Sequence, residues 1–211
     1  HYGVFDDAAG DLAGATRRLT DAMVDAARIE PGVDVLDVGC GIGAPACYLA
    51  AEFGARVTGI TTSATGVRAA AARAAAQGLQ GLVKFEQRDG MDTGLADAAF
   101  DRVWVLESSH LMRRRDMLIA ECARVLAPGG RMALCDIVLR RPMDLLEVRR
   151  LRAPLSVLRE VFGDARMEPL AEYRRLAADN GLVVELERDL TSQTRPTFAR
   201  WRENADGHSD E

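Results

Sequence analysis

The sequence predicts an α/β fold in which a doubly wound, mainly parallel sheet carries helices on both faces. Short β-branched segments alternate with alanine-rich helical segments along most of the chain. A glycine-rich turn joins the first such strand to its helix, as expected where a backbone approaches a ligand. With 211 residues, 48% of them apolar, the chain is long and apolar enough to bury one core.

The first elements set the pattern. Residues 11–29 place apolar side chains at helical spacing and end at the turn Glu30-Pro31-Gly32, which predicts a helix. Residues 33–38 are a β-branched run that stops at a glycine, which predicts a strand. A helix is expected to begin near Ala44-Pro45, because proline fits the first helical turn.

The same unit recurs further along the chain. We expect strands over 55–61, 83–88, 101–106 and 131–138, and helices over 64–77 and 116–126. Gly78 closes the first of these helices, and Pro128-Gly129-Gly130 closes the second. Strands joined by crossover helices in this way form a parallel sheet.

The alternation changes after residue 140. Residues 141–168 are charged and compatible with helix, and we expect a helical, lid-like insert there, after the fifth strand and within one domain spanning 1–211. The crossover helix is then expected over 169–180, between Pro169 and Asn180-Gly181. Residues 182–190 predict a sixth strand.

Charge, apolar content and cysteine spacing limit the kinds of partner and compartment that we expect for this protein. A formal charge of −5 gives no attraction to nucleic acid or to anionic membranes, and the arginine run 113–115 is expected to be a solvated face. No apolar run reaches membrane-spanning length, and the first residues lack the pattern of a signal peptide. Four widely spaced cysteines suit a reducing compartment. We therefore expect a cytoplasmic protein that acts on a small molecule, with an oligomeric state left open, a homodimer included.

The strongest local signal is Asp37-Val38-Gly39-Cys40-Gly41-Ile42-Gly43, at the end of the first strand. Glycines there let the backbone turn tightly and approach a ligand. Taken alone, this turn also matches the loose dinucleotide-binding pattern, so it does not decide between cofactors. The decision depends on segments further along the chain.

Two later segments are informative: Asp97-Ala98-Ala99-Phe100-Asp101-Arg102-Val103-Trp104 and Leu126-Ala127-Pro128-Gly129-Gly130-Arg131. Together with the glycine turn, and in this order, they resemble the class I S-adenosylmethionine (SAM)-dependent methyltransferases over roughly residues 30–140. This resemblance implies a Rossmann-like fold, SAM as the cofactor and methyl transfer as the activity.

The resemblance also implies which residues bind SAM. The glycine turn would contact the methionine and ribose parts, with Asp37 orienting the turn or the cofactor ammonium group. Thr61 and Ser63 would form hydrogen bonds to the ribose or the carboxylate of SAM, because no acidic residue ends the second strand. Gly66 stands where a subgroup of relatives has glutamine. Asp89 would accept from the adenine amino group. The expected cofactor-binding residues are Tyr2, Asp37, Gly39, Cys40, Gly41, Gly43, Thr61, Ser63, Asp89, Gly90, Met91 and Glu107.

Glu107-Ser108-Ser109-His110-Leu111-Met112 follows the fourth strand, at the edge of the sheet where ligands bind. Asp136 lies in an apolar strand near the same edge and needs a partner if it is buried. His110 held by Asp136 would be an oriented general base. The segment resembles that of sugar O-methyltransferases of the rebeccamycin type, although Leu111 replaces a second histidine. The resemblance to cyclopropane-synthase-like relatives lies instead in Gly59-Ile60-Thr61-Thr62-Ser63, at the end of the second strand.

These expectations favour one function and leave two alternatives. We expect methyl transfer to a hydroxyl of a secondary metabolite or its sugar, as in antibiotic biosynthesis, with His110 and Asp136 as catalytic residues. The alternatives are a C- or N-methyltransferase, or a cyclase-like protein that binds SAM without transferring its methyl group. No further carboxylates or histidines cluster near His110 beyond Asp136 and Glu107, so we expect no metal.

Overall fold

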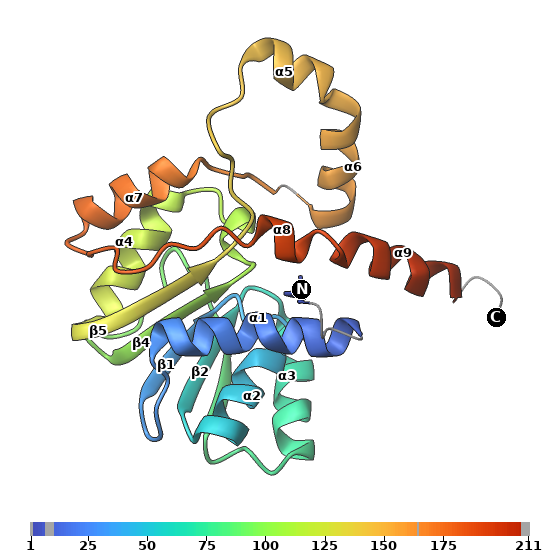
Figure 1. Cartoon of the computed structure of the whole chain (residues 1–211). Helices are drawn as coiled ribbons and strands as arrows, with labels where there is room; N and C mark the ends of the chain where they lie inside the picture. The colour runs from blue at the N-terminus through green and yellow to red at the C-terminus, as the bar shows by residue number, and fades with distance from the viewer. Residues whose placement is uncertain (1, 7–10, 164, 208–211) are drawn as a thin grey trace. The chain divides into compact units, whose positions relative to one another are not determined.

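The structure is a computed structural model that describes residues 2–6, 11–163 and 165–207. The chain divides into two compact units, one of residues 27–184 and one of residues 1–26 with 185–211. The first carries the sheet and is drawn in Figure 1 from blue to orange. A single domain over 1–211 stays a prediction, and His1 lies outside the described residues.

A parallel sheet forms the core of residues 27–184. Its strands are β1 (Asp34–Val38), β2 (Arg56–Thr61), β3 (Val83–Gln87), β4 (Phe100–Leu106) and β5 (Leu126–Cys135). They lie in the order β3-β2-β1-β4-β5, and each neighbouring pair is parallel. The chain leaves β1 toward β2 and returns on its other side as β4. The carboxyl end of β1 is therefore the switch point at which open α/β sheets bind ligands.

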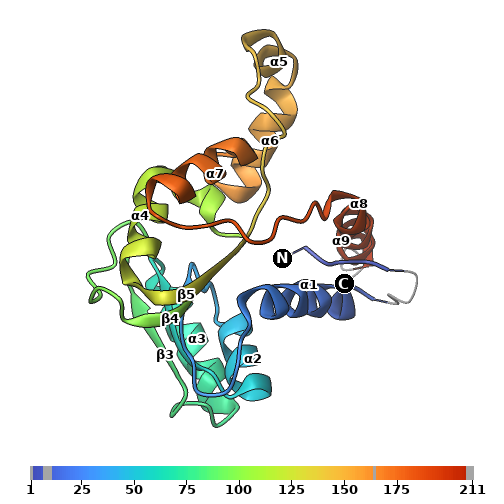
Figure 2. The same cartoon turned by 60° about the vertical axis from the view of Figure 1, so that its left-hand side comes forward.

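Helices pack on both faces of this sheet, as Figures 1 and 2 show. The crossover helices α2 (Ala44–Phe53), α3 (Ala64–Ala76) and α4 (Arg115–Val125) each join two strands, and α7 (Leu170–Asp179) follows the last strand. α2 and α3 pack together against β2 and β3, while α4 packs with α7 and against β5. Leu36, Val38, Val103 and Val105 bury one strand face against Leu118 of α4. The predicted doubly wound fold is confirmed.

The prediction of a sixth strand is wrong. Residues 182–190 form no strand in the structure, and Val183, Val184 and Leu186 are exposed. The alternation Val-Val-Glu-Leu-Glu suits a strand with one buried face, but no described segment pairs with it. β-propensity without a partner strand and a covering layer does not form a sheet.

Residues 141–168 contain two helices, α5 (Leu145–Arg150) and α6 (Arg152–Phe162). A capping box begins α5: the Asp144 carboxylate accepts from the Glu147 N–H, and the Glu147 side chain accepts from the Asp144 N–H. Leu145 is 84% exposed and Leu146 65% exposed, so this segment presents apolar side chains to solvent. Its role as a lid stays a prediction.

The other unit contains most of α1 (Leu12–Ala27) with α8 (Thr191–Thr194) and α9 (Thr197–Gly207). Residues 3–5 contact α8 and the start of α9 within this unit, because the Gly3 N–H donates to Thr197 Oγ1 and the Phe5 N–H donates to the Gln193 carbonyl. The rings of Tyr2, Phe198 and Trp201 pack together, with centroids 5.2–5.7 Å apart. These contacts tie down an otherwise irregular start of the chain.

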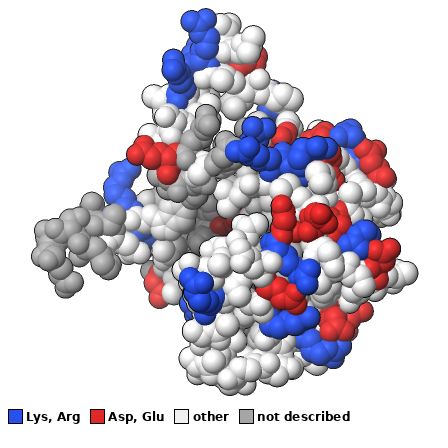
Figure 3. All heavy atoms as spheres, turned by 180° about the vertical axis from the view of Figure 1, so that it is seen from behind, with Lys and Arg blue, Asp and Glu red and all other residues white. Residues whose placement is uncertain are grey.

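Charges of both signs are interspersed on the face drawn in Figure 3, without a large basic area. Many charges in the described part of the chain form local ion pairs, such as Arg175 with Glu172 and Arg114 with Asp116. Within the same residues, no helix combines the length and apolar character that crossing a bilayer requires.

Candidate active site

The sheet brings most of the predicted site residues to one edge. Asp37 is the penultimate residue of β1, Thr61 ends β2, and Asp89 lies two positions beyond β3. Glu107 follows β4, and Asp136 follows β5. Because parallel strands present their carboxyl ends at the same edge, residues up to 99 positions apart (Asp37 and Asp136) gather there.

The glycine turn after β1 is shaped by contacts within the protein. Gly39, Gly41 and Gly43 all have positive φ, at +82°, +55° and +76°. A Cβ on Gly39 would lie 2.3 Å from Ser108 Cβ, and one on Gly43 would lie 2.6 Å from the Phe85 ring. A Cβ on Gly41 would meet nothing within 4 Å. Gly39 and Gly43 are thus required for packing, whereas Gly41 faces open space where a ligand can approach.

Hydrogen bonds fix the turn on neighbouring strands. The N–H groups of Gly39 and Cys40 both donate to the Ile60 carbonyl of β2, at 2.9 and 3.0 Å. The Ser108 hydroxyl, after β4, donates to the Val38 carbonyl at 2.7 Å. Cys40 is buried, and burial raises the pKa of its thiol to about 12, so the thiol stays protonated and inert. Ser108 was not among the predicted site residues, although it fills the space that glycine leaves at position 39.

Asp37 is a buried carboxyl group with an incomplete set of partners. It is 2% exposed, and among the described residues Oδ2 has no hydrogen-bond partner. Burial raises its pKa to about 7. A buried acceptor that lacks a donor suits a positively charged or N–H-bearing ligand at the glycine turn. The ammonium group of SAM has this chemistry, so Asp37 and the open side of Gly41 fit the cofactor implied by the sequence.

Thr61 and Ser63 shape the turn after β2. Ser63 is the N-cap of α3, and its hydroxyl accepts from the Gly66 N–H at 3.0 Å. Thr61 Oγ1 accepts from the Ser63 N–H at 3.3 Å. A Cβ on Gly66 would lie 2.9 Å from the Gly41 carbonyl, so glycine at this position lets α3 approach the glycine turn. Each hydroxyl keeps a proton to donate, and ribose binding by these residues stays a prediction.

The loop after β3 carries Asp89, Gly90 and Met91. The Asp89 carboxylate is exposed and accepts from the Met91 N–H at 2.9 Å, which closes a local turn. Gly90 is buried, and a Cβ there would lie 2.6 Å from Val38 Cγ1 on β1. Gly90 therefore packs directly beside β1, and the Asp89 carboxylate stays near the carboxyl edge. Its contact with adenine stays a prediction.

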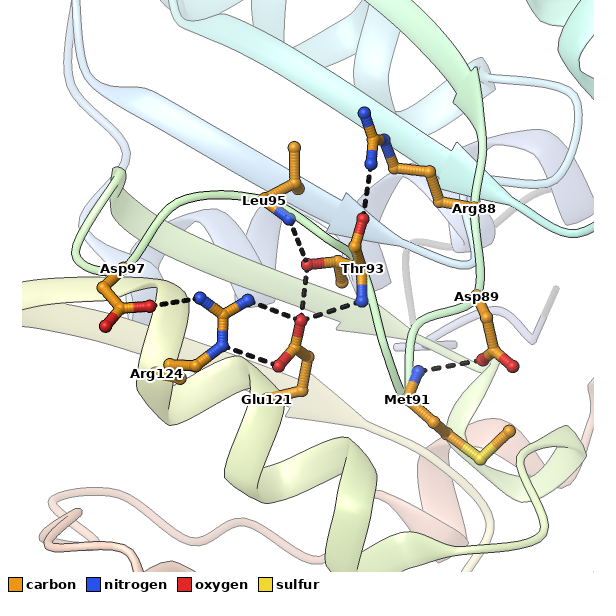
Figure 4. Close-up of polar contacts among 8 residues, drawn as sticks. All are labelled: Arg88, Asp89, Met91, Thr93, Leu95, Asp97, Glu121 and Arg124. Atoms are coloured by element: carbon orange, nitrogen blue, oxygen red, sulfur yellow. Dashed lines mark hydrogen bonds and ion pairs between the residues drawn. The ribbon is translucent and has the colours of Figure 1, made fainter.

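A polar cluster anchors this loop to α4, as Figure 4 shows. The N–H and hydroxyl of Thr93 both donate to Glu121 Oε1, at 2.8 and 2.6 Å. Arg124 donates to both oxygens of Glu121 and pairs with Asp97. The hydrogen bond from Arg124, with those from Thr93, lowers the pKa of Glu121 to about 2. Thr93 and Glu121 were not predicted, because nothing in the sequence links residues 28 positions apart in a loop and a helix.

His110 and Asp136 lie in direct contact. His110 is on a 3₁₀ turn (Ser109–Leu111), and its Nδ1 lies 2.6 Å from Asp136 Oδ1. The side chains are 8% and 0% exposed. Burial alone would raise the pKa of Asp136, but the hydrogen bonds from His110 and Ser109 and the charge of a protonated His110 lower it by more, so the net direction is down and the carboxylate stays ionised. An ionised carboxylate only accepts, so Nδ1 carries the proton of this hydrogen bond, and Nε2 is the nitrogen that can act as a base in the neutral form of the ring.

The remaining predicted residues are placed less directly. Glu107 has a left-handed φ of +49°, and its N–H donates to the Cys135 carbonyl at 2.8 Å, which continues the β4–β5 pairing by one residue. Tyr2 packs in the aromatic cluster of the terminal unit. Cofactor contacts of Glu107 and Tyr2 stay predictions. In the described part of the chain, no group of three or more His, Cys, Asp or Glu residues has the geometry of a metal site.

Comparison with known proteins identifies the family. A family model described as "Methyltransferase domain" matches residues 36–134. The 27-O-demethylrifamycin SV methyltransferase of Amycolatopsis mediterranei (strain S699) is 38% identical over 208 residues, covering 98% of this chain and 75% of that protein.

Two solved structures are also similar. The [4+2]-cyclase SpnF has a TM-score of 0.85 and 30% identity, with 99% of this chain and 72% of that chain covered. The geranyl diphosphate C-methyltransferase from Streptomyces coelicolor A3(2), solved with Mg²⁺, geranyl diphosphate and S-adenosyl-L-homocysteine, has a TM-score of 0.82 and 25% identity, with 96% and 80% covered. The chain therefore belongs to the class I SAM-dependent methyltransferases, and S-adenosyl-L-methionine is its cofactor.

Proposed function

We propose that this enzyme transfers a methyl group to a hydroxyl of a secondary metabolite, with His110 as the general base and Asp136 as the group that orients it. The observation that carries the proposal is the 2.6 Å contact between His110 Nδ1 and a fully buried Asp136 carboxylate. The relative from Amycolatopsis is named for O-methylation of a rifamycin, a hydroxyl-bearing natural product, which supports oxygen as the acceptor atom.

The chain's own residues would act in three places. The glycine turn, Asp37, Thr61, Ser63 and Asp89 would hold SAM, which supplies an electrophilic methyl group. His110 Nε2 would remove the proton from the acceptor hydroxyl as its oxygen becomes the nucleophile. Asp136 would stabilise the resulting imidazolium, because the carboxylate is ionised and already bonded to Nδ1–H. The new O–C bond forms as the C–S bond breaks, with S-adenosyl-L-homocysteine as the leaving group, and holding the acceptor oxygen in line with that bond would contribute much of the rate acceleration.

Residues 141–168 would form a lid over the acceptor. The exposed apolar side chains of α5 suit an apolar metabolite, and burying them around it would exclude water from the reacting groups. The end of this segment is tied to the base, because the Arg166 N–H donates to the His110 carbonyl at 2.7 Å.

We place the enzyme in the cytoplasm, acting on a free small molecule rather than on nucleic acid. The free cysteines and the charge of −5 support this placement.

The test is a product assay with SAM that carries ¹³C in its methyl group. Wild-type enzyme would be incubated with 27-O-demethylrifamycin SV and a panel of hydroxyl-bearing polyketides, and products analysed by mass and carbon NMR. An O-linked ¹³C-methyl signal is expected, and His110→Asn should reduce kcat by about a hundredfold or more, since general bases contribute factors of this order. Full kcat in folded His110→Asn would remove His110 as the base.

Two relatives point to alternatives that the same assay separates. Similarity to a C-methyltransferase leaves carbon as an acceptor atom, and the label would then appear bound to carbon. Similarity to the [4+2]-cyclase leaves a reaction in which SAM is bound without being consumed. Labelled SAM would then remain intact while an added polyene substrate cyclises.

A further inference from the structure

The Asp136 carboxylate is held by more than the histidine it orients. Oδ1 accepts from His110 Nδ1 and from the Ile137 N–H, at 2.6 and 2.7 Å. Oδ2 accepts from the His110 N–H at 2.9 Å and from the Ser109 hydroxyl. Both oxygens are thus fixed, and Asp136 cannot rotate its charge away from His110 without breaking these bonds.

The Ser109 hydroxyl in turn contacts Tyr173, on α7. Their oxygens lie 2.8 Å apart, and Ser109 is 0% and Tyr173 7% exposed. Ser109 has one proton, which it donates to Asp136, so the Tyr173 O–H must be the donor to Ser109 Oγ. The directions of all the hydrogen bonds from Tyr173 to His110 are therefore determined.

Tyr173 is suited to remain a donor. Burial raises its pKa above the ordinary value, against smaller lowering effects of Ser109 and Arg115, so the hydroxyl keeps its proton. The Arg115 guanidinium lies 5.5 Å from the centre of the Tyr173 ring and donates to the carbonyls of Met112 and Arg166. Arg115 thereby fixes the ring from α4, while α7 fixes its backbone.

We propose that Tyr173 is a positioning residue for methyl transfer, which acts through Ser109 to hold the Asp136 carboxylate against His110. This inference rests on the proposed function for its catalytic meaning, but the hydrogen-bond relay itself can be measured without any acceptor. It also gives α7, the helix directly after the predicted lid, a contact with the base.

The test measures how fast the His110 Nδ1 proton exchanges with solvent, by NMR of protein with ¹⁵N-labelled histidine. His110→Asn assigns the signal, and S-adenosyl-L-homocysteine is used to saturate the cofactor site. Tyr173→Phe keeps the ring under Arg115 and removes only the hydroxyl. Losing one hydrogen bond from the relay should raise the exchange rate about three- to tenfold. Tyr48→Phe, on α2, is the matched control and should leave the rate unchanged.

A double-mutant cycle with Ser109→Ala separates positioning from general loosening. If Tyr173 acts through Ser109, Tyr173→Phe adds nothing once Ser109 has lost its hydroxyl. Equal rates in wild type and Tyr173→Phe, or additive effects of the two changes, would overturn the inference. Failure of the proposed function looks different: His110→Asn would keep full methyl transfer while the exchange rates still showed the relay.

Discussion

Replacing Asp37 by asparagine should stabilise the protein at alkaline pH and weaken its binding of SAM. Asparagine has nearly the same shape but cannot ionise, so the variant removes the cost of a buried charge. Burial raises the pKa of Asp37 from 3.8 to about 7. A carboxyl group whose pKa is higher in the folded state destabilises the fold increasingly as pH rises above its pKa in the unfolded state. This loss of stability levels off once pH exceeds its pKa in the folded state.

The size of the effect follows from that shift. Each pKa unit corresponds to about 1.4 kcal/mol, so the full cost of the ionised group approaches about 4 kcal/mol above pH 8. At about pH 5 the same relation gives about 2 kcal/mol. The stability difference between Asp37→Asn and wild type should therefore grow by about 2–3 kcal/mol between these pH values, or about 5–10 °C in Tm for a chain of this size.

The assay is differential scanning calorimetry of both proteins across this pH range, without and with saturating SAM. Groups other than Asp37 titrate in both proteins and cancel in the difference. SAM should stabilise wild type more than the variant at pH 8, because its ammonium group would pair with the Asp37 carboxylate. A Tm difference that does not change with pH would refute the buried, unpaired charge. Equal stabilisation of both proteins by SAM would refute Asp37 as a cofactor contact.

Further predictions concern the glycine turn, the base and the adenine loop. Gly39→Ala should lower Tm far more than Gly41→Ala, because only the first places a Cβ 2.3 Å from Ser108 while both add the strain of a positive φ; equal losses would contradict this. Asp136→Asn should lower kcat by about a hundredfold with little change in KM for SAM, whereas the exposed control Asp116→Asn should not, and unchanged kcat would exclude the proposed orientation. Glu121→Gln should weaken SAM binding in calorimetry more than the control Glu172→Gln on α7, because Glu121 binds Thr93 and so holds the loop after β3. Equal binding by the two variants would show that this contact does not position the loop. Because the pKa of Glu121 is lowered to about 2, its stabilising effect is complete above about pH 4.5 and lost as pH falls toward 2, and acid titration of the Gln variant should lack this component.

The central strands β1, β2 and β4 could be predicted from the sequence because most of their residues are buried and they therefore contain short apolar stretches. Residues 33–38 and 101–106 illustrate this, and both form strands within one residue of the predicted ends. Residues 182–190 have similar β-propensity but form no strand, since sheet formation depends on a partner that local sequence does not reveal. Propensity therefore predicted central strands better than an edge strand.

The residues of the candidate site also fall into a group that the sequence predicts and a group that it does not. Asp37, the glycine turn, His110 and Asp136 follow strands directly, so their meeting at one edge follows from the parallel fold alone. Ser109, Tyr173, Thr93 and Glu121 depend on which loop and which helix pack together. A tyrosine on α7 has no sequence signature that ties it to a serine 64 positions earlier. Such supporting contacts become visible only with side chains in place.

The central claim is that SAM binds at the glycine turn after β1, and titration calorimetry with S-adenosyl-L-homocysteine tests it most directly. Gly41→Trp places a large side chain in the open space beside the turn, while Gly78→Trp adds the same residue at a similar positive φ, also in open space, after α3. Saturable binding by wild type and Gly78→Trp, lost in folded Gly41→Trp, is the predicted result. Undiminished binding by Gly41→Trp, or no binding by folded wild type, would contradict the account.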